Sequence, residues 1–138
     1  MKVTADDDNR LPPGRTPRVL VVDDEESLRE LLELTLVGMG LDVDVAEDLS
    51  TARALLERYR YSLCLTDMRL PDGNGLDILD AMRAEPRLRD VPVMVISAVA
   101  DDRLFEDAKS RGASACLSKP VDLQEVRQVA LGLLYSGY

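Results

Sequence analysis

The chain has 138 residues, of which 46% are apolar and 31% are charged, and this is the size and composition of one globular domain. Its 17 basic and 26 acidic residues give a net charge of −9, so we expect no direct binding of nucleic acid by this domain. The absence of histidine excludes histidine-based acid–base catalysis, histidine-ligated zinc and a phosphohistidine relay within the chain.

The N-terminal segment differs in composition from the rest of the chain. It is polar, contains Pro12, Pro13 and Pro17, and has no periodic apolar pattern, so we predict a flexible tail over residues 1–17 and one domain over 18–138. Uninterrupted apolar runs reach only about four residues, and therefore we expect no membrane span.

The two cysteines, Cys64 and Cys116, stand inside apolar runs and not at a paired spacing. We therefore predict that both are small buried residues with free thiols. This usage of cysteine, together with the lack of a signal-peptide core, predicts a cytoplasmic protein.

From residue 18 onward, short apolar runs alternate with amphipathic stretches, and this order occurs five times. The runs predict strands, and apolar residues three or four positions apart predict helices. The expected strands are Val19–Val22, Asp42–Ala46, Leu63–Thr66, Val93–Ile96 and Ala113–Leu117. The expected helices are Glu26–Met39, Ser50–Tyr59, Leu76–Ala84, Arg103–Arg111 and a last helix that begins with Asp122.

The character of the strands predicts their order in a parallel sheet. The first, third and fourth strands (VLVV, LCLT and VMVI) are apolar throughout, as expected for strands covered by helices on both faces. The second strand (DVDVA) alternates and the fifth (ASACL) has small residues, which is typical of edge strands. The predicted fold is therefore α/β: a doubly wound five-stranded sheet of order 2-1-3-4-5, the flavodoxin-like (βα)5 arrangement.

Polar residues follow four of the five expected strands. Asp23 and Asp24 follow the first, Asp67 the third, Ser97 the fourth and Lys119 the fifth. Because ligands bind at the carboxyl ends of parallel strands, these side chains are expected at one edge of the sheet. Two carboxylates about 5 Å apart repel by roughly 3 kcal/mol at an effective dielectric constant of about 20, and a Mg²⁺ ion would offset this repulsion.

This set of residues suits the transfer of a phosphoryl group to an aspartate, with Mg²⁺ and Lys119 stabilising the transferred charge. Each residue alone has a simpler explanation: an Asp-Asp pair often caps a helix, and a single Asp, Ser or Lys is common in turns and on surfaces. These separate explanations do not account for the joint placement at four strand ends.

The segments VLVVDDEE, LTDMRLPDGNGLDIL, VMVISA and LSKPVDL resemble the response-regulator receiver family of two-component signalling, over about residues 18–135. The second and last of these segments also resemble receivers of enhancer-binding activators of the nitrogen-regulation type. The resemblance implies a phosphorylation-dependent switch that accepts a phosphoryl group from a histidine kinase and controls an output domain or partner protein, in transcription. Such a domain is not an enzyme with external substrates; it catalyses only its own phosphotransfer and dephosphorylation.

The resemblance assigns the acidic residues one by one. Asp67 matches the phosphoacceptor, Asp24 matches the direct Mg²⁺ ligand, and Asp23 matches the ligand that acts largely through water. Met68 matches the position whose main-chain carbonyl also binds the metal. The implied metal ligands are therefore Asp23, Asp24, Asp67 and the Met68 carbonyl.

The resemblance also assigns the residues that respond to phosphorylation. Ser97 corresponds to the switch hydroxyl that turns toward the phosphoryl group, and Lys119 pairs with a phosphoryl oxygen. The Lys119–Pro120 bond is normally cis in this family. Many receivers carry Tyr or Phe three residues before the Lys, where this chain has Cys116. We hypothesise that the rotation of that ring is absent here or is displaced onto Phe105.

Two hypotheses stay open. The first is the phosphorylation-controlled switch, in which the face formed by the fourth helix, fifth strand and fifth helix meets the output domain or partner, and phosphorylation favours a homodimer. The second is a scaffold of the same fold that docks partners without phosphorylation. Because the chain ends at residue 138, the sequence is compatible with a single-domain regulator and with a piece of a longer protein.

Overall fold

The computed structural model describes residues 16–98 and 102–136. The strands are β1 Arg18–Val22, β2 Asp42–Ala46, β3 Leu63–Asp67, β4 Arg69–Leu70, β5 Gly73–Asn74, β6 Val93–Ser97 and β7 Ala115–Ser118. The helices are α1 Glu26–Gly38, α2 Leu49–Arg58, α3 Gly75–Ala84, α4 Asp102–Ser110 and α5 Leu123–Leu131, and a π-helical segment, Gly132–Ser136, continues α5.

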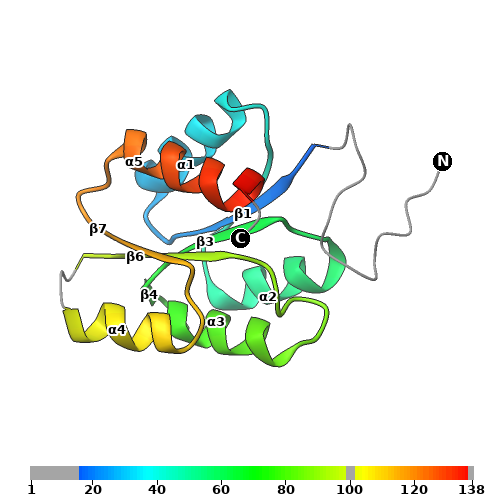
Figure 1. Ribbon diagram of the computed structural model, residues 1–138, viewed down its shortest axis with the longest axis vertical. Helices are drawn as coiled ribbons and strands as arrows, with labels where there is room; N and C mark the ends of the chain where they lie inside the picture. Colours follow the sequence, from blue (N-terminus) through cyan, green and yellow to red (C-terminus); the bar gives the residue numbers. More distant parts are fainter. Residues whose placement is uncertain (1–15, 99–101, 137–138) are drawn as a thin grey trace.

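Five parallel strands form the central sheet in the order β2-β1-β3-β6-β7 (Figure 1). This is the predicted 2-1-3-4-5 order, because the short strands β4 and β5 form a separate hairpin. Every residue of β3 and β6 is buried, whereas most residues of the edge strands β2 and β7 are not. Strands with helices on both faces must be apolar throughout, and this requirement explains why the patterns predicted the order.

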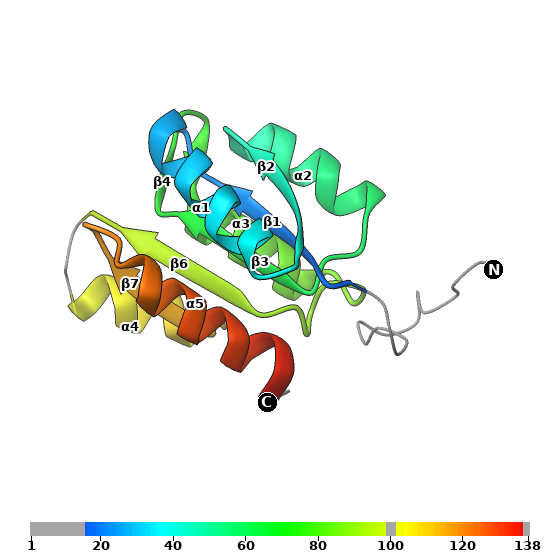
Figure 2. The ribbon, with the colours of Figure 1, turned by 90° about the horizontal axis from the view of Figure 1, so that it is seen from above.

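The helices form two layers around the sheet. Helices α1 and α5 cover one face, and α2, α3 and α4 cover the other (Figure 1). Successive residues of β1 therefore enter different cores: Val19 and Val21 pack with residues of α1 and α5, and Leu20 and Val22 pack with residues of α2 and α3. Strand β7 lies between α4 and α5, which are on opposite faces of the sheet (Figures 1 and 2).

The segment after β3 contains structure that the sequence patterns did not predict. Arg69 pairs with Asn74 and Leu70 with Gly73, so the expected loop is a short antiparallel hairpin. Helix α3 begins one residue before the predicted start because Asn74 caps it: the Asn74 side chain accepts hydrogen bonds from two backbone N–H groups, and Asp77 accepts from the Asn74 N–H.

The last strand begins at Ala115 and not at Ala113 as predicted. The N–H of Ala113 donates to the carbonyl of Ala108 at 2.9 Å, so this residue belongs to the turn that follows α4. Gly112, with φ at +107°, makes the turn that ends the helix.

The prediction of two buried thiols is correct for Cys64 and wrong for Cys116, which is only half-buried because β7 is an edge strand. Burial raises the pKa of the Cys64 thiol to about 12. Within residues 16–98 and 102–136, no helix has both the length and the apolar character needed to cross a bilayer. The predicted tail lies outside the described residues except for its last two positions, so the domain boundary stays a prediction.

Candidate functional site

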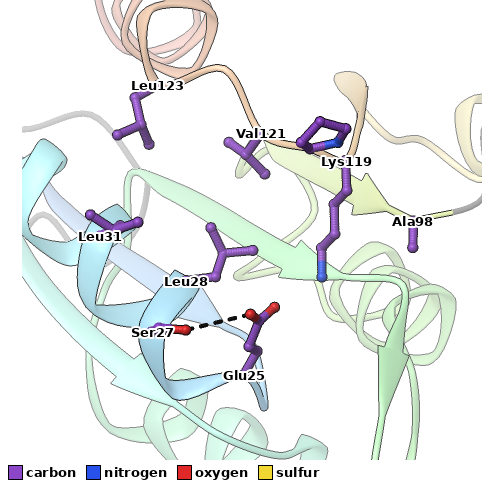
Figure 3. A pocket seen from close by; sticks show the side chains of 9 residues that line it. Glu25, Ser27, Leu28, Leu31, Ala98, Lys119, Val121 and Leu123 are labelled. Carbon is purple, nitrogen blue, oxygen red and sulfur yellow. Dashed lines mark hydrogen bonds between the residues drawn. The ribbon is translucent and has the colours of Figure 1, made fainter.

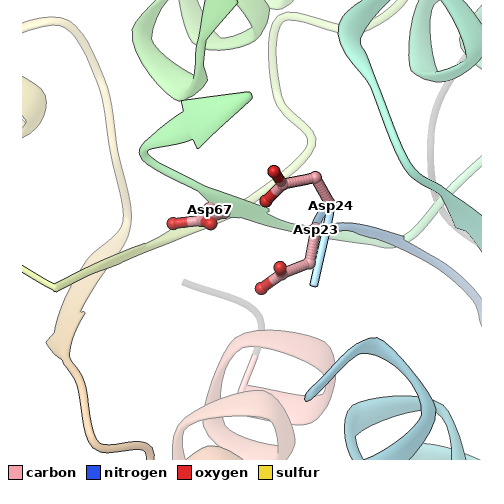
Figure 4. A group of neighbouring side chains, drawn as sticks. All are labelled: Asp23, Asp24 and Asp67. Carbon is pink, nitrogen blue, oxygen red and sulfur yellow. The ribbon is translucent and has the colours of Figure 1, made fainter. Parts of the chain in front are cut away.

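Three carboxylates gather where β1 and β3 end (Figure 4). Asp23 and Asp24 directly follow β1, and Asp67 is the last residue of β3. Because β1 and β3 are parallel neighbours with Val22 beside Thr66, the residues that follow meet at the same edge. One carboxylate oxygen from each of the three acids lies within 4.8 Å of one carboxylate oxygen from each of the other two. Asp23 and Asp67 are buried, and Asp24 is exposed.

Lys119 reaches these acids from the loop after the edge strand β7. Its Nζ lies 3.2 Å from Oδ2 of Asp67 and 3.8 Å from Oδ2 of Asp23. Its backbone N–H donates to the carbonyl of Ser97 at 2.8 Å, which holds the loop against the end of β6. The Lys119–Pro120 bond is cis, as the resemblance implied. The ammonium group therefore joins the acids at one edge of the sheet.

Ser97 ends β6, the strand next to β3, and is buried. Ile96 lies beside Asp67 in the sheet, and the carbonyl of Ile96 accepts a hydrogen bond from the N–H of Met68 at 2.8 Å. Strands β3 and β6 therefore end side by side, and Ser97 lies at the same edge as Asp67. The structure thus brings the side chains of Asp23, Asp24, Asp67 and Lys119 together and places Ser97 at the same edge of the sheet.

The carboxyl group of Asp23 is held in an unfavourable environment. Burial raises the pKa of Asp23 above its usual range, and the charge of Asp67 adds to this effect, although the hydrogen bond from the Glu25 N–H opposes it. That N–H lies 2.8 Å from Oδ1 of Asp23. Among the described residues, no group donates a hydrogen bond to the buried Oδ2. The Lys119 ammonium, 3.8 Å from Oδ2, lowers the pKa of Asp23 but lies beyond hydrogen-bond distance. A buried carboxylate oxygen without a hydrogen-bond donor is destabilising, and a bound metal ion would supply a direct partner.

The donor set fits a hard divalent cation. Carboxylate oxygens from three aspartates are the ligands that Mg²⁺ prefers in proteins, with water completing its coordination. One exposed acid, Asp24, leaves the site open to water on that side. The orphaned Oδ2 of Asp23 and the three converging carboxylates are therefore the observations that support a metal site here.

The main-chain carbonyl of Met68 already has a partner. It accepts a hydrogen bond from the N–H of Gly75 at 2.8 Å, which ties it to the beginning of α3. A carbonyl oxygen has a second lone pair, so this bond leaves one acceptor position. The role of Met68 as a metal ligand stays a prediction.

Two residues near the acids were not selected from the sequence. A Cβ atom on Gly75 would lie 2.6 Å from the carbonyl oxygen of Asp67, so only glycine lets α3 approach the end of β3 this closely. The carboxylate of Asp72 accepts hydrogen bonds from the N–H groups of Leu49 and Ser50 at 2.8 and 3.0 Å, and this joins the hairpin after Asp67 to the beginning of α2. No periodic pattern signals contacts of this kind.

A cavity of about 550 Å³ opens beside Lys119, between the beginning of α1 and the loop that precedes α5 (Figure 3). Its apolar wall includes Leu28 and Leu31 of α1 together with Val121 and Leu123. Glu25 also lines it and accepts a hydrogen bond from the Ser27 hydroxyl at 3.4 Å. Lys119 therefore lines both this cavity and the acidic site.

Cys116 lies three residues before Lys119, and its sulfur is 3.9 Å from the carbonyl oxygen of Phe105 on α4. Burial raises the pKa of the Cys116 thiol. The two residues of the displaced-ring hypothesis are therefore neighbours, and the hypothesis itself stays a prediction.

A family model described as the response regulator receiver domain matches residues 19–131. The response regulator protein PilR of Pseudomonas aeruginosa is 45% identical over 112 residues, which cover 81% of this chain and 25% of PilR. The alginate biosynthesis transcriptional regulatory protein AlgB of the same organism is 39% identical over 114 residues, which cover 82% of this chain and 25% of AlgB. These relatives support the resemblance to receivers of enhancer-binding activators. The chain spans about a quarter of their length.

Solved structures share the fold. The chemotaxis response regulator CheY4 of Vibrio cholerae matches with a TM-score of 0.82 and 24% identity, over 87% of this chain and 100% of that one. The receiver domain of HemR from Leptospira biflexa matches with a TM-score of 0.80 and 29% identity, over 87% of this chain and 95% of that one. With the family model matching most of the chain and the strand order agreeing, this chain belongs to the response regulator receiver domain family.

Proposed function

We propose that this domain is a phosphorylation-dependent signalling switch, in which Asp67 accepts a phosphoryl group from a partner histidine kinase with the help of Mg²⁺. The observation that carries the proposal is the ammonium group of Lys119, 3.2 Å from Oδ2 of Asp67, beside three converging carboxylates. An acid that serves only as a turn or capping residue does not need a partly buried ammonium group and two further acids around it.

In the proposed reaction, a carboxylate oxygen of Asp67 attacks phosphorus as the bond from phosphorus to the donor imidazole nitrogen breaks. The product is an acyl phosphate on Asp67, and the imidazole is released. Lys119 stabilises the charge on the transferring phosphoryl oxygens, since its ammonium group already lies beside Asp67. Bound Mg²⁺ would supply further neutralisation of these oxygens. In the later dephosphorylation, water attacks phosphorus as the bond from phosphorus to the Asp67 oxygen breaks, which releases inorganic phosphate and restores the carboxylate. The domain acts on no external substrate.

The proposed metal ligands are Asp24 directly, Asp23 largely through water, Asp67, and the main-chain carbonyl of Met68. Asp23 supports this assignment most strongly, because the buried Oδ2 has no hydrogen-bond donor among the residues that the structure describes. The Met68 carbonyl would use the lone pair that the Gly75 N–H leaves available.

The proposed response begins at Ser97. Its hydroxyl turns toward the phosphoryl group, and the change passes along the chain to α4, which begins at Asp102. The surface formed by α4, β7 and α5 would then bind an output domain or partner protein, or a second phosphorylated copy of this domain. The name of the relative AlgB supports an output in transcription. The net charge of −9 supports an output through contact with another protein, and not through direct binding of nucleic acid by this domain. We place this switch in the cytoplasm.

Labelling with acetyl phosphate and Mg²⁺ tests the proposal against the unphosphorylated scaffold. We expect the wild-type chain to gain the mass of one phosphoryl group and Asp67→Asn to gain none. A matched control is Asp80→Asn, because Asp80 is an exposed acid that pairs with Arg111 on the surface. If the wild-type chain gains no phosphoryl group and does not bind beryllofluoride, the scaffold is the correct description.

A further inference from the structure

Arg29, at the end of the first turn of α1, contacts the backbone of the acidic cluster. Its Nη1 donates a hydrogen bond to the carbonyl oxygen of Asp23 at 3.0 Å. The side chain is half-buried, so α1 and the end of β1 hold it in place. The roles assigned above do not include this residue.

The other polar atoms of Asp23 show what this contact does. The backbone N–H of Asp23 donates to the carbonyl of Ala46 at 3.0 Å, and Oδ1 accepts from the N–H of Glu25 at 2.8 Å. With the carbonyl bound by Arg29, three of the four polar atoms of Asp23 have hydrogen-bond partners. The fourth, Oδ2, has no donor in the part of the chain that the structure describes and faces Lys119 at 3.8 Å.

This arrangement selects one orientation of Asp23. A carboxylate held through its backbone N–H, its carbonyl and one oxygen has little freedom to turn its second oxygen away from the site. Without Arg29, the carbonyl of Asp23 would lose its side-chain donor and the turn from β1 into α1 would be free to shift. Asp24 is the next residue in the chain, and the same shift would move its carboxylate.

We propose that Arg29 is a positioning residue for the cation site: its hydrogen bond to the Asp23 carbonyl holds the Asp23–Asp24 segment in the orientation that binds Mg²⁺. This inference rests on the proposed function, because it assigns a role to Arg29 at the same site. Arg29 does not contact the reacting atoms, so its loss should weaken the affinity for Mg²⁺ more than it slows phosphorylation at saturating Mg²⁺.

Another arginine provides a matched control. Arg83 also donates to backbone carbonyls, those of Gly112 and Val91, both at 2.8 Å. Val91 precedes β6 and Gly112 precedes β7, so Arg83 acts at the opposite edge of the sheet from the acids. Arg83→Met should therefore reduce stability without changing the affinity for Mg²⁺.

The test measures Mg²⁺ binding to the full chain by isothermal titration calorimetry, with unfolding in urea and EDTA as the measure of stability. For Arg29→Met we expect affinity for Mg²⁺ about 10-fold weaker, the effect of one hydrogen bond that involves a charged group. Arg29→Lys and Arg29→Gln each retain a donor, so both should bind Mg²⁺ more tightly than Arg29→Met. These two variants also keep the test decisive if Arg29→Met does not fold.

The outcomes separate this inference from the proposed function. If the wild-type chain binds no Mg²⁺ and accepts no phosphoryl group, the proposed function fails. If the wild-type chain does both, and the three Arg29 variants bind Mg²⁺ as tightly as wild type, only the positioning role is wrong. Equal losses of Mg²⁺ affinity in Arg29→Met and Arg83→Met would also overturn it, because the effect would then follow general stability.

Discussion

The Nζ of Lys119 lies 3.2 Å from Oδ2 of Asp67, although the two residues are 52 positions apart in the chain. Asp67 ends β3 and Lys119 directly follows β7, and β6 lies between these two strands. The long lysine side chain crosses the end of β6 to reach the acid, and the contact is mostly shielded from solvent, with 20% of the lysine side chain and 8% of the aspartate side chain exposed.

The first prediction concerns this ion pair. Lys119→Met keeps the apolar stem and removes the ammonium group, so the rate of labelling by acetyl phosphate should fall by about 10²-fold, as for the loss of one group that stabilises transition-state charge. Mg²⁺ should still bind, because all three carboxylates remain. Mass spectrometry over time measures the rate, and calorimetry measures the metal. Labelling at the wild-type rate would show that Lys119 has no part in the transfer.

The second prediction concerns the stability of the metal-free protein. Because burial raises the pKa of Asp23 in the folded state, ionised Asp23 destabilises the fold. In EDTA at pH 7, Asp23→Asn should therefore unfold at a higher urea concentration than wild type, with a free energy of unfolding larger by on the order of 1 kcal/mol. The same variant should bind Mg²⁺ more weakly. The same substitution thus improves stability and impairs metal binding.

The pH dependence of this difference has a definite sign. The unfolded carboxyl has a pKa of about 3.9. Below that value Asp23 is protonated in both states, so ionisation of Asp23 contributes nothing to the difference. As the pH rises from there through the raised pKa of the folded protein, the wild type should lose stability relative to Asp23→Asn. Urea unfolding at several pH values measures this change, and a difference that is constant with pH would contradict it.

The third prediction concerns the approach of α3 to Asp67. In Gly75→Ala the new Cβ would meet the Asp67 carbonyl oxygen at 2.6 Å and Cγ2 of Thr66 at 3.2 Å. Since a backbone atom cannot rotate away, the helix must shift, and we expect a loss of stability of about 1–3 kcal/mol together with slower labelling. Gly38→Ala is the control, because no atom of the described residues lies within 4 Å of a Cβ at that position. Equal stabilities for the two variants would contradict the steric argument.

The fourth prediction concerns Asp72, whose carboxylate caps α2 from the hairpin after Asp67. The pKa of Asp72 lies below its usual value, mainly because the Leu49 N–H donates a hydrogen bond to its carboxylate. The hydrogen bond from the Ser50 N–H adds to this effect. A carboxyl with a lowered pKa stabilises the fold above the unfolded pKa of about 3.9, and this contribution is lost as the pH falls through the folded value. Asp72→Ala should therefore have a lower Tm than wild type at pH 7, and the difference should shrink in acid.

Thermal unfolding between pH 7 and pH 3 measures this effect. Asp80→Ala is the comparison, because Asp80 pairs with Arg111 on the exposed surface and such pairs contribute little. If the Tm of both variants falls by the same amount relative to wild type at pH 7, Asp72 does not hold the hairpin to α2 more strongly than a surface pair would.

Most of the fold was predictable from patterns within single segments. Inner strands such as VMVI must be apolar throughout because helices cover both faces, and this fact predicted the strand order. The hairpin of β4 and β5 was missed because strands of two residues carry no periodic signal. Ala113 was placed in a strand because it is small and apolar, but a hydrogen bond to Ala108 keeps it in the turn after α4.

For the site, the sequence by itself determined which side chains stand at the carboxyl ends of the strands, because alternation and strand order place Asp23, Asp67, Ser97 and Lys119 at one edge. Only the tertiary structure decided their distances, the orphaned Oδ2 of Asp23, and the contact that Arg29 makes with the Asp23 carbonyl. The physical reason is that burial depends on the local hydrophobic pattern, whereas a polar contact between separate elements depends on how helices and loops pack around the sheet.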